Sequence, residues 1–199
     1  MSGRLIRDFW QTIVHGAQQL FLGLCALILL QGVSMADRTT VAPITVTSSA
    51  FVQGGEIPTL YTCEGEDSSP PLRWSGVPDN ADTLVLIVDD PDAPDPQAPK
   101  MTWVHWLVYN LPAQLTALNP GTVSIDLPAG AEEGINNWDR KLFGGPCPPI
   151  GRHRYFFKLY ALDSALSGLA SPDKDALLAA MKGHIIGYGE LMGTYKKKH

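Results

Sequence analysis

Turn-forming residues interrupt this chain about once every ten residues from Gly54 onward, as in GGEIP, GEDSSPP, SGVPDNAD, NLPA and GGPCPPIG. Between these interruptions lie short runs that are rich in Val, Ile, Thr, Tyr, Phe and Trp. Many short strands separated by evenly spaced turns are typical of a β-sandwich or a β-barrel. The spacing therefore predicts a mostly β domain.

Five of the runs have a strand pattern. Residues 44–51 alternate between apolar and polar, which is typical of a half-buried strand. Residues 83–88 (TLVLIV) and 103–111 (WVHWLVYNL) are apolar on both faces, which predicts central strands. Residues 153–162 alternate, and residues 184–195 have the composition of a last strand.

One helix is predicted over residues 172–182. Ser171 is a suitable N-cap, and Pro172 fits the first helical position. Acidic residues follow in the first turn, where the helix dipole favours them, and Gly183 can end the helix.

The first 36 residues differ from the rest of the chain. Arg4 and Arg7 precede an uncharged apolar run at residues 20–30. That run is short for a membrane span but suits the apolar core of a secretory signal, and the small residues before position 37 predict cleavage after Ala36. We expect a signal peptide at residues 1–36 and a secreted or periplasmic domain at 37–199, with an uncleaved membrane anchor as the alternative.

The chain is acidic, with a formal net charge of −5. Acidic chains do not bind nucleic acid through bulk electrostatics, so no nucleic-acid partner is expected. The basic run at residues 196–198 is interpreted as a solvated tail.

Two cysteines, Cys63 and Cys147, follow the apolar segment. An even number in an exported protein favours a disulfide, and two buried free thiols are the alternative. A bridge closing a loop of this length would stabilise the fold by about 4 kcal/mol.

The segment DDPDAPDPQAP holds four aspartates and four prolines directly after the apolar run at 83–88. Proline restricts the residue before it to extended backbone, so Asp90 and Asp92 would sit in fixed positions. The alternative is a solvated loop that caps a sheet edge. Asp89 and Asp95 are interpreted as surface charge.

His105 is a polar residue in a strand that is otherwise apolar on both faces. Strict alternation would put it on one face with Trp103, Leu107 and Tyr109, an aromatic surface suited to a pocket. A core histidine with one backbone partner is the alternative.

His153 and Tyr155 share one face of their strand with Phe157 and Leu159. They follow a PPIG turn that could bring backbone N–H groups close to a ligand. Two imidazoles, a phenol and a carboxylate could form a small anion site, in which the aspartate orients a histidine and favours its charged form.

Catalysis is the less favoured use of these residues. Two histidines and an aspartate could ligate zinc, but the HExxH and HxxxH motifs are absent, as are a GxSxG elbow and a P-loop. We expect no metal, no cofactor and no enzymatic activity, and a metal-dependent or His/Asp hydrolase is kept as the weakest alternative.

The segments DPDAP, WVHWLVYNLP and GPCPPIGRHRYFFKLYALD resemble the phosphatidylethanolamine-binding protein family, also called Raf kinase inhibitor-like proteins. IPTLYTCEGEDSSPPLRW and GHIIGYGELMGTY resemble its bacterial and archaeal branch, and the resemblance covers roughly residues 44–195. It implies a sandwich of two antiparallel sheets with one or two short helices.

The resemblance also implies a non-enzymatic protein with a small pocket for phosphate-like groups or phospholipid head groups. The implied pocket residues are Asp90, His105, Pro149, His153 and Tyr155. Asp92, Trp103 and Pro148 would form its rim.

Two departures from the family pattern stand out. The segment NNWDRKLF replaces a run of small residues, and Phe143 replaces a tyrosine, which would remove one hydroxyl from the pocket. Some microbial relatives resemble serine protease inhibitors, so inhibition of a serine protease through surface loops is the alternative function. Relatives in this branch look dimeric, so the resemblance also implies a homodimer.

Overall fold

The computed structural model describes residues 40–198 of the chain. The expected signal peptide or anchor at residues 1–36, and the domain boundary after it, lie outside the described residues and stay predictions. Within residues 40–198, no helix is long and apolar enough to cross a membrane.

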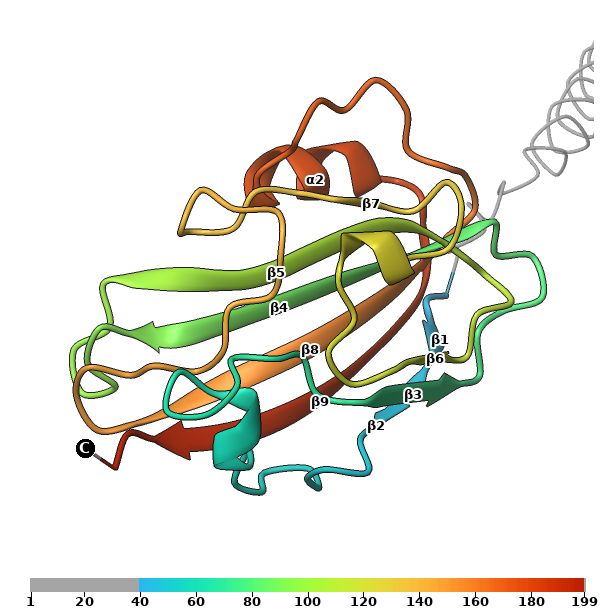
Figure 1. The fold of residues 1–199 in the computed structure, drawn as a ribbon. Helices are drawn as coiled ribbons and strands as arrows, with labels where there is room; N and C mark the ends of the chain where they lie inside the picture. Colours follow the sequence, from blue (N-terminus) through green and yellow to red (C-terminus); the bar gives the residue numbers. More distant parts are fainter. Residues whose placement is uncertain (1–39, 199) are drawn as a thin grey trace, which may run out of the picture. The chain divides into compact units, whose positions relative to one another are not determined.

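The described chain forms two β-sheets and one α-helix, which confirms the expected fold class (Figure 1). The larger sheet has the strand order β1-β9-β8-β4-β5-β7, and the smaller sheet has the order β2-β3-β6. All pairs are antiparallel except β1 with β9. The elements are β1 (Ala42–Pro43), β2 (Thr45–Thr47), η1 (Thr59–Tyr61), β3 (Leu72–Ser75), β4 (Thr83–Ala93), β5 (Met101–Pro112), β6 (Ala117–Leu118), η2 (Ser124–Asp126), β7 (Glu132–Glu133), β8 (Arg152–Leu162), α2 (Lys174–Met181) and β9 (Ile185–Lys196).

The four long strands β4, β5, β8 and β9 make up most of the larger sheet, and its two edges end in the two-residue strands β1 and β7. β4 lies between β8 and β5 and is buried along its first eight residues, as its two apolar faces predict. β8 alternates between buried and more exposed positions, also as predicted.

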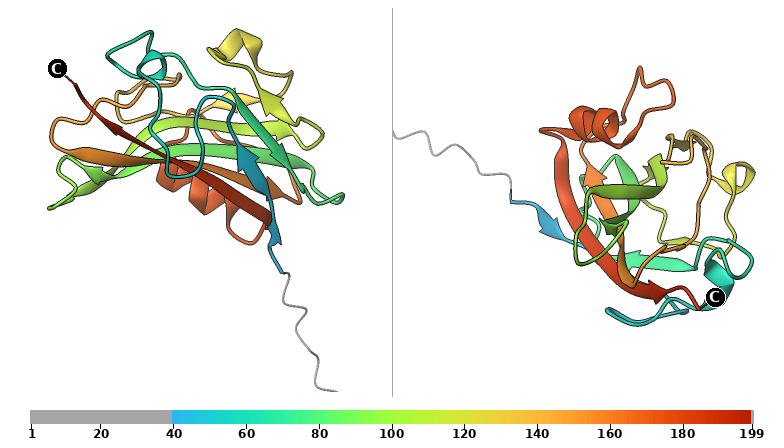
Figure 2. Two further views of the ribbon diagram at one scale, coloured as in Figure 1. Left: turned by 90° about the horizontal axis from the view of Figure 1, so that it is seen from below. Right: turned by 90° about the vertical axis from the view of Figure 1, so that its left-hand side faces the viewer.

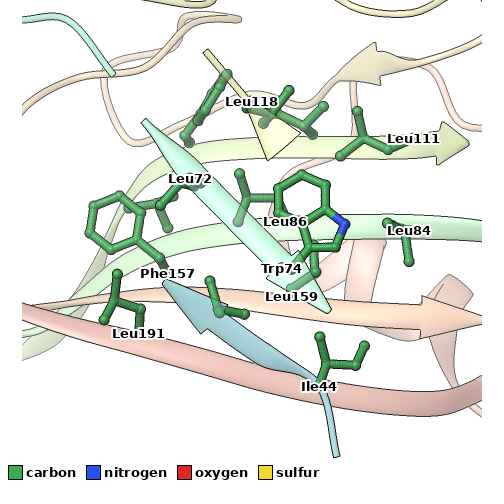
Figure 3. Close-up of a cluster of buried hydrophobic side chains, with 14 of the residues drawn as sticks. Ile44, Leu72, Trp74, Leu84, Leu86, Leu111, Leu118, Phe157, Leu159 and Leu191 are labelled. Atoms are coloured by element: carbon green, nitrogen blue, oxygen red, sulfur yellow. The ribbon is translucent and has the colours of Figure 1, made fainter. Parts of the chain in front are cut away.

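The larger sheet is covered on both faces, by α2 on one and by the smaller sheet on the other (Figure 2). Leu177 and Met181 of α2 pack on Val85, Ile87 and Leu107 of the sheet. On the opposite face, Leu72 and Trp74 of β3 pack over apolar side chains of β4, β8 and β9 (Figure 3). The labelled side chains of that core are Ile44, Leu72, Trp74, Leu84, Leu86, Leu111, Leu118, Phe157, Leu159 and Leu191.

The helix is shorter at its start than predicted. Its N-cap is Asp173, whose carboxylate accepts a hydrogen bond from the Ala176 N–H (2.8 Å). Ser171 does not cap the helix because its backbone is in the left-handed region (φ 53°). Gly183 follows the helix with φ 86°, as a terminating glycine should.

The acidic proline segment is not all loop, because β4 continues through Asp90 to Ala93. Pro91 lacks an N–H, and it falls where the pairing with β5 is irregular, between Asp90–Trp103 and Ala93–Met101. A proline at such a point removes no regular ladder hydrogen bond, so the strand can pass through it.

The prediction that Asp89 is a surface charge is wrong. Its side chain is buried and lies 2.8 Å from Nζ of Lys158 and 2.6 Å from Nζ of Lys174. Because Lys174 belongs to α2, its contact with Asp89 links the helix to the central strand β4. Asp95 is partly exposed and accepts a hydrogen bond from the Gln97 N–H (2.9 Å).

The face predicted for His105 is also wrong in part. Val88 pairs with Trp106 and Asp89 pairs with Val104, so His105 is the extra residue of a β-bulge. After the bulge the alternation is reversed. Leu107 and Tyr109 therefore pack on the helix side of the sheet, while His105 lines a cavity.

Cys63 and Cys147 form a disulfide, which confirms the predicted bridge. It joins the turn after η1 to the segment that precedes β8. Cys63 is exposed, whereas Cys147 is partly buried.

Candidate functional site

A cavity of about 310 Å³ lies at the end of the larger sheet where β4 ends and where β5 and β8 begin. The segment that carries Cys147 closes one side of it. Its lining residues are Asp90, Ala93, Pro94, Trp103, His105, Trp138, Cys147, Pro148, Pro149, His153 and Tyr155. Asp90 and His153 are 63 positions apart in sequence, and the antiparallel order of the strands brings them together.

The structure gathers most of the predicted site residues around this one cavity. Asp90, His105, Pro149, His153 and Tyr155 all line it, and so do the expected rim residues Trp103 and Pro148. The remaining rim residue, Asp92, is not part of the lining. Its carboxylate instead receives two hydrogen bonds from the Arg154 guanidinium, at 2.9 and 2.7 Å, and a third from the Arg154 N–H. These bonds lower the pKa of Asp92.

Asp90 orients His153. Oδ2 of Asp90 lies 2.7 Å from Nδ1 of His153, and Nε2 of His153 lies 2.9 Å from the Ile150 carbonyl oxygen. A carbonyl oxygen only accepts hydrogen bonds, so Nε2 of His153 carries a hydrogen. The hydrogen bond between Nδ1 and the Asp90 carboxylate needs one further proton, which the two side chains share. Burial raises the pKa of Asp90, while the hydrogen bond from His153 opposes that rise.

His105 is held in one tautomer. Its Nδ1 lies 2.6 Å from the Gly144 carbonyl oxygen, so Nδ1 carries the hydrogen. Burial lowers the pKa of His105 to about 4, and the Gly144 carbonyl and the charge of Asp89 only partly oppose this. His105 is therefore neutral at pH 7.

Two hydrogen-bond donors of the cavity lining have no partner within residues 40–198. They are the buried hydroxyl of Tyr155 and the buried indole Nε1 of Trp103. Buried donors of this kind normally have a partner, so their presence in a cavity lining points to a ligand or to bound water. Burial raises the pKa of Tyr155, and the charges of Asp90 and Asp92 raise it further, so the phenol stays a donor.

Trp138 is a lining residue that the sequence analysis did not identify. Its ring meets those of Trp103 and His105 edge to face, with centroids 5.3 and 5.1 Å away. Oδ1 of Asn136 fixes this loop by accepting hydrogen bonds from the N–H groups of Trp138 and Arg140. A tryptophan within the polar run NNWDR was the available signal, because an apolar ring in a loop often covers a site.

Gly144 is needed for this arrangement, because a Cβ at that position would lie 2.5 Å from the Trp138 ring. Phe143, which replaces a family tyrosine, is buried against Trp106, with ring centroids 5.8 Å apart, and does not line the cavity. Within the described part of the chain, no group of three or more His, Cys, Asp or Glu side chains could hold a metal ion.

We expect His105 to make folding stability depend on pH. The unfolded chain binds the imidazole proton near pH 6.5 and the folded chain only near pH 4, so the free energy of unfolding falls as the pH drops through that window. The expected contribution is a loss of about 3 kcal/mol between pH 7 and pH 4, measured by urea denaturation.

The matched variant for this measurement is His105→Asn, whose side-chain N–H can still reach the Gly144 carbonyl but does not titrate. The difference in free energy of unfolding between the parent and this variant should narrow as the pH falls. Asp90 and Asp92 are present in both proteins, so their contributions cancel in this difference. Stability curves that stay parallel from pH 7 to pH 4 would contradict the assignment.

The fold and cavity together define a β-sandwich binding protein with a small pocket at one end of its larger sheet. Residues 47–196 match the phosphatidylethanolamine-binding protein family, and the chain belongs to that family. A UPF0098 protein of Methanothermobacter thermautotrophicus is 45% identical over 149 residues, which cover 74% of this chain and 95% of the relative.

Two solved structures support the same assignment. The phosphatidylethanolamine-binding protein homologue CT736 from Chlamydia trachomatis is 44% identical, with a TM-score of 0.71 over 78% of this chain and 99% of that one. YbcL of Escherichia coli, described as a member of the mammalian PEBP family, is 32% identical, with a TM-score of 0.70 and the same coverage.

Proposed function

We propose that this protein binds small phosphate-containing molecules or phospholipid head groups in the cavity between β4, β5 and β8, without chemical turnover. The observation that carries the proposal is the pair of unpartnered donors, from Tyr155 and Trp103, in the lining of a preformed cavity. An oxyanion would satisfy such donors and recover the cost of burying them.

The neighbouring side chains support binding rather than turnover. The sulfur of Cys147 is in the disulfide and is not free as a nucleophile. Both ring nitrogens of His153 are engaged with protein groups, so this histidine shapes the cavity through its ring and its link to Asp90. Aromatic and proline side chains make up much of the cavity lining, and polar contacts to a bound anion are stronger in such apolar surroundings.

We further propose that the domain acts outside the reducing cytosol, as the apolar N-terminal run suggests. The Cys63–Cys147 disulfide supports this location, because disulfides persist in oxidising compartments.

The test is a titration of the full chain with phosphoethanolamine, followed by NMR signals of the histidine side chains. Saturable shifts are expected for the parent protein, and they should be lost in His105→Ala and His153→Ala. His184→Ala is the matched control, because His184 is exposed and bonded to Asp163 outside the cavity lining, and it should titrate like the parent.

A flat titration of the folded parent protein would sink the anion-pocket proposal. In that case the inhibition of serine proteases by the full chain would be measured next. Inhibition that is unaffected by His153→Ala would assign the function to the surface loops instead.

A further inference from the structure

The two cavity histidines differ in what they can offer a ligand. Both nitrogens of His153 are used by the protein, through Asp90 and the Ile150 carbonyl. His105 uses only Nδ1, toward the Gly144 carbonyl. Within residues 40–198, the only hydrogen bond of the His105 ring is the one at Nδ1, so Nε2 is the one ring nitrogen of this pair that is free for a ligand.

Nε2 of His105 is an acceptor. The Gly144 carbonyl fixes the hydrogen on Nδ1, so the neutral ring presents a lone pair at Nε2. His105 is 3% exposed, and its ring packs edge to face between the rings of Trp138 and Tyr155, with centroids 5.1 and 5.2 Å away. This packing leaves little water to solvate a second proton, in agreement with the lowered pKa of His105.

The cavity lining therefore combines two donors with one acceptor. A fully deprotonated phosphate satisfies the donors of Tyr155 and Trp103, but it places an oxygen lone pair against the lone pair of His105. A singly protonated phosphate satisfies all three, because its P–O–H group can donate. Leaving a buried acceptor unsatisfied typically costs five- to a hundredfold in affinity, about 1–3 kcal/mol.

Building on the proposed function, we propose that the pocket selects phosphate monoesters in their singly protonated form, with the P–O–H group donating to Nε2 of His105. A phosphodiester has no such hydrogen at neutral pH. The free head group phosphoethanolamine should therefore bind better than the same group esterified to glycerol, as it is in a phospholipid.

None of the ionisable groups around His105 supplies the proton of the hydrogen bond to Nε2, so this proton comes from the ligand. Asp89 of β4 is paired with Lys158 and Lys174. Asp90, also of β4, shares a proton with His153 of β8. Tyr155 keeps its proton because its pKa is raised. The loop contributes Arg140, which lies over the Trp138 ring and cannot release a proton near neutral pH.

The test compares phosphoethanolamine with glycerophosphoethanolamine by calorimetry on the full chain, in two buffers that differ in ionisation enthalpy. A monoester loses its last proton near pH 6, so binding should take up nearly one proton at pH 8 and almost none at pH 5. The dissociation constant for phosphoethanolamine should rise about tenfold from pH 7 to pH 8. At pH 6 the diester should bind at least about tenfold more weakly than the monoester.

Two variants assign the effect to the proposed atom. His105→Asn keeps an N–H for Gly144 and removes Nε2, so proton uptake and the monoester preference should both disappear. Tyr155→Phe removes a donor that both ligands use, so it should weaken both and leave their ratio unchanged. If His105→Asn does not fold, the proton uptake and the relative affinities of the two esters, both measured on the parent protein, still test the proposal.

Three results would overturn the proposal while leaving the anion pocket intact. They are equal affinity for the two esters, no proton uptake at pH 8, and a ¹⁵N signal of a doubly protonated His105 ring in the complex. Binding of neither ester would overturn the pocket itself, and this proposal with it.

Discussion

Asp90→Ala should lower the free energy of unfolding by about 3 to 5 kcal/mol and abolish phosphoethanolamine binding. Within residues 40–198, Asp90 is the only side chain that hydrogen-bonds to Nδ1 of His153, and both residues are buried. Removing the carboxylate leaves an imidazole nitrogen buried without a partner. In the parent protein, Oδ1 of Asp90 also accepts a hydrogen bond from the Asp92 N–H (2.8 Å), and the alanine variant loses this bond at the end of β4 as well. Urea denaturation at pH 7 measures the loss.

Asp79→Ala is the matched control, because it removes an exposed carboxylate and should change stability by less than about 0.5 kcal/mol. Asp90→Asn should recover part of the loss, since its amide can donate to Nδ1 while Nε2 still donates to Ile150. If Asp90→Ala is as harmless as Asp79→Ala, the Asp90–His153 contact does not contribute to the native state.

Replacing both cysteines, as in Cys63→Ser/Cys147→Ser, should destabilise the domain by about 4 kcal/mol. The bridge spans 84 positions in sequence, so its loss greatly increases the conformational freedom of the unfolded chain. Thermal or urea denaturation of the oxidised parent and the double variant gives the difference.

Reduction of the parent protein should reproduce that loss, because the exposed Cys63 makes the bridge accessible to a thiol reagent. The reduced parent and the double variant should then unfold at the same denaturant concentration. Equal stability of the oxidised parent and the double variant would show that the bridge adds nothing to the fold.

Much of the fold could be predicted from the sequence because the long strands have strong local patterns. The apolar run at 83–88 and the alternation at 153–162 correspond to β4 and β8, which lie side by side at the centre of the larger sheet. The gathering of His105 and His153 around one cavity depends on strand order, which local pattern does not contain. Side-chain chemistry favoured a shared anion site, and the family resemblance implied the pocket residues.

The wrong expectations for Asp89 and for the face of His105, and the missed Trp138, share a physical cause, since each depends on contacts between distant segments. Asp89 looked like a loop residue because its partners, Lys158 and Lys174, lie far along the chain. The bulge at His105 reverses an alternation that the sequence alone shows as regular. Trp138 was not predicted to line the site, because its loop has no periodic sequence pattern. Hydrogen bonds of Asn136 to the Trp138 N–H and to the backbone of β5 hold this loop in place.

The short strands at the margins of the larger sheet have a consequence for aggregation. The segment from β1 to Ile57 hydrogen-bonds to β9 at Tyr188, Met192 and Thr194, at distances of 2.7 to 2.8 Å. β7 covers Val108 and Tyr109 of β5 on the opposite margin. The unpaired backbone groups of an exposed edge strand can pair with further chains and start amyloid-like stacking. In this protein, segments of the same chain occupy much of both edges of the larger sheet. Peptides that add to β9 by strand pairing would first have to displace the protein's own N-terminal segment.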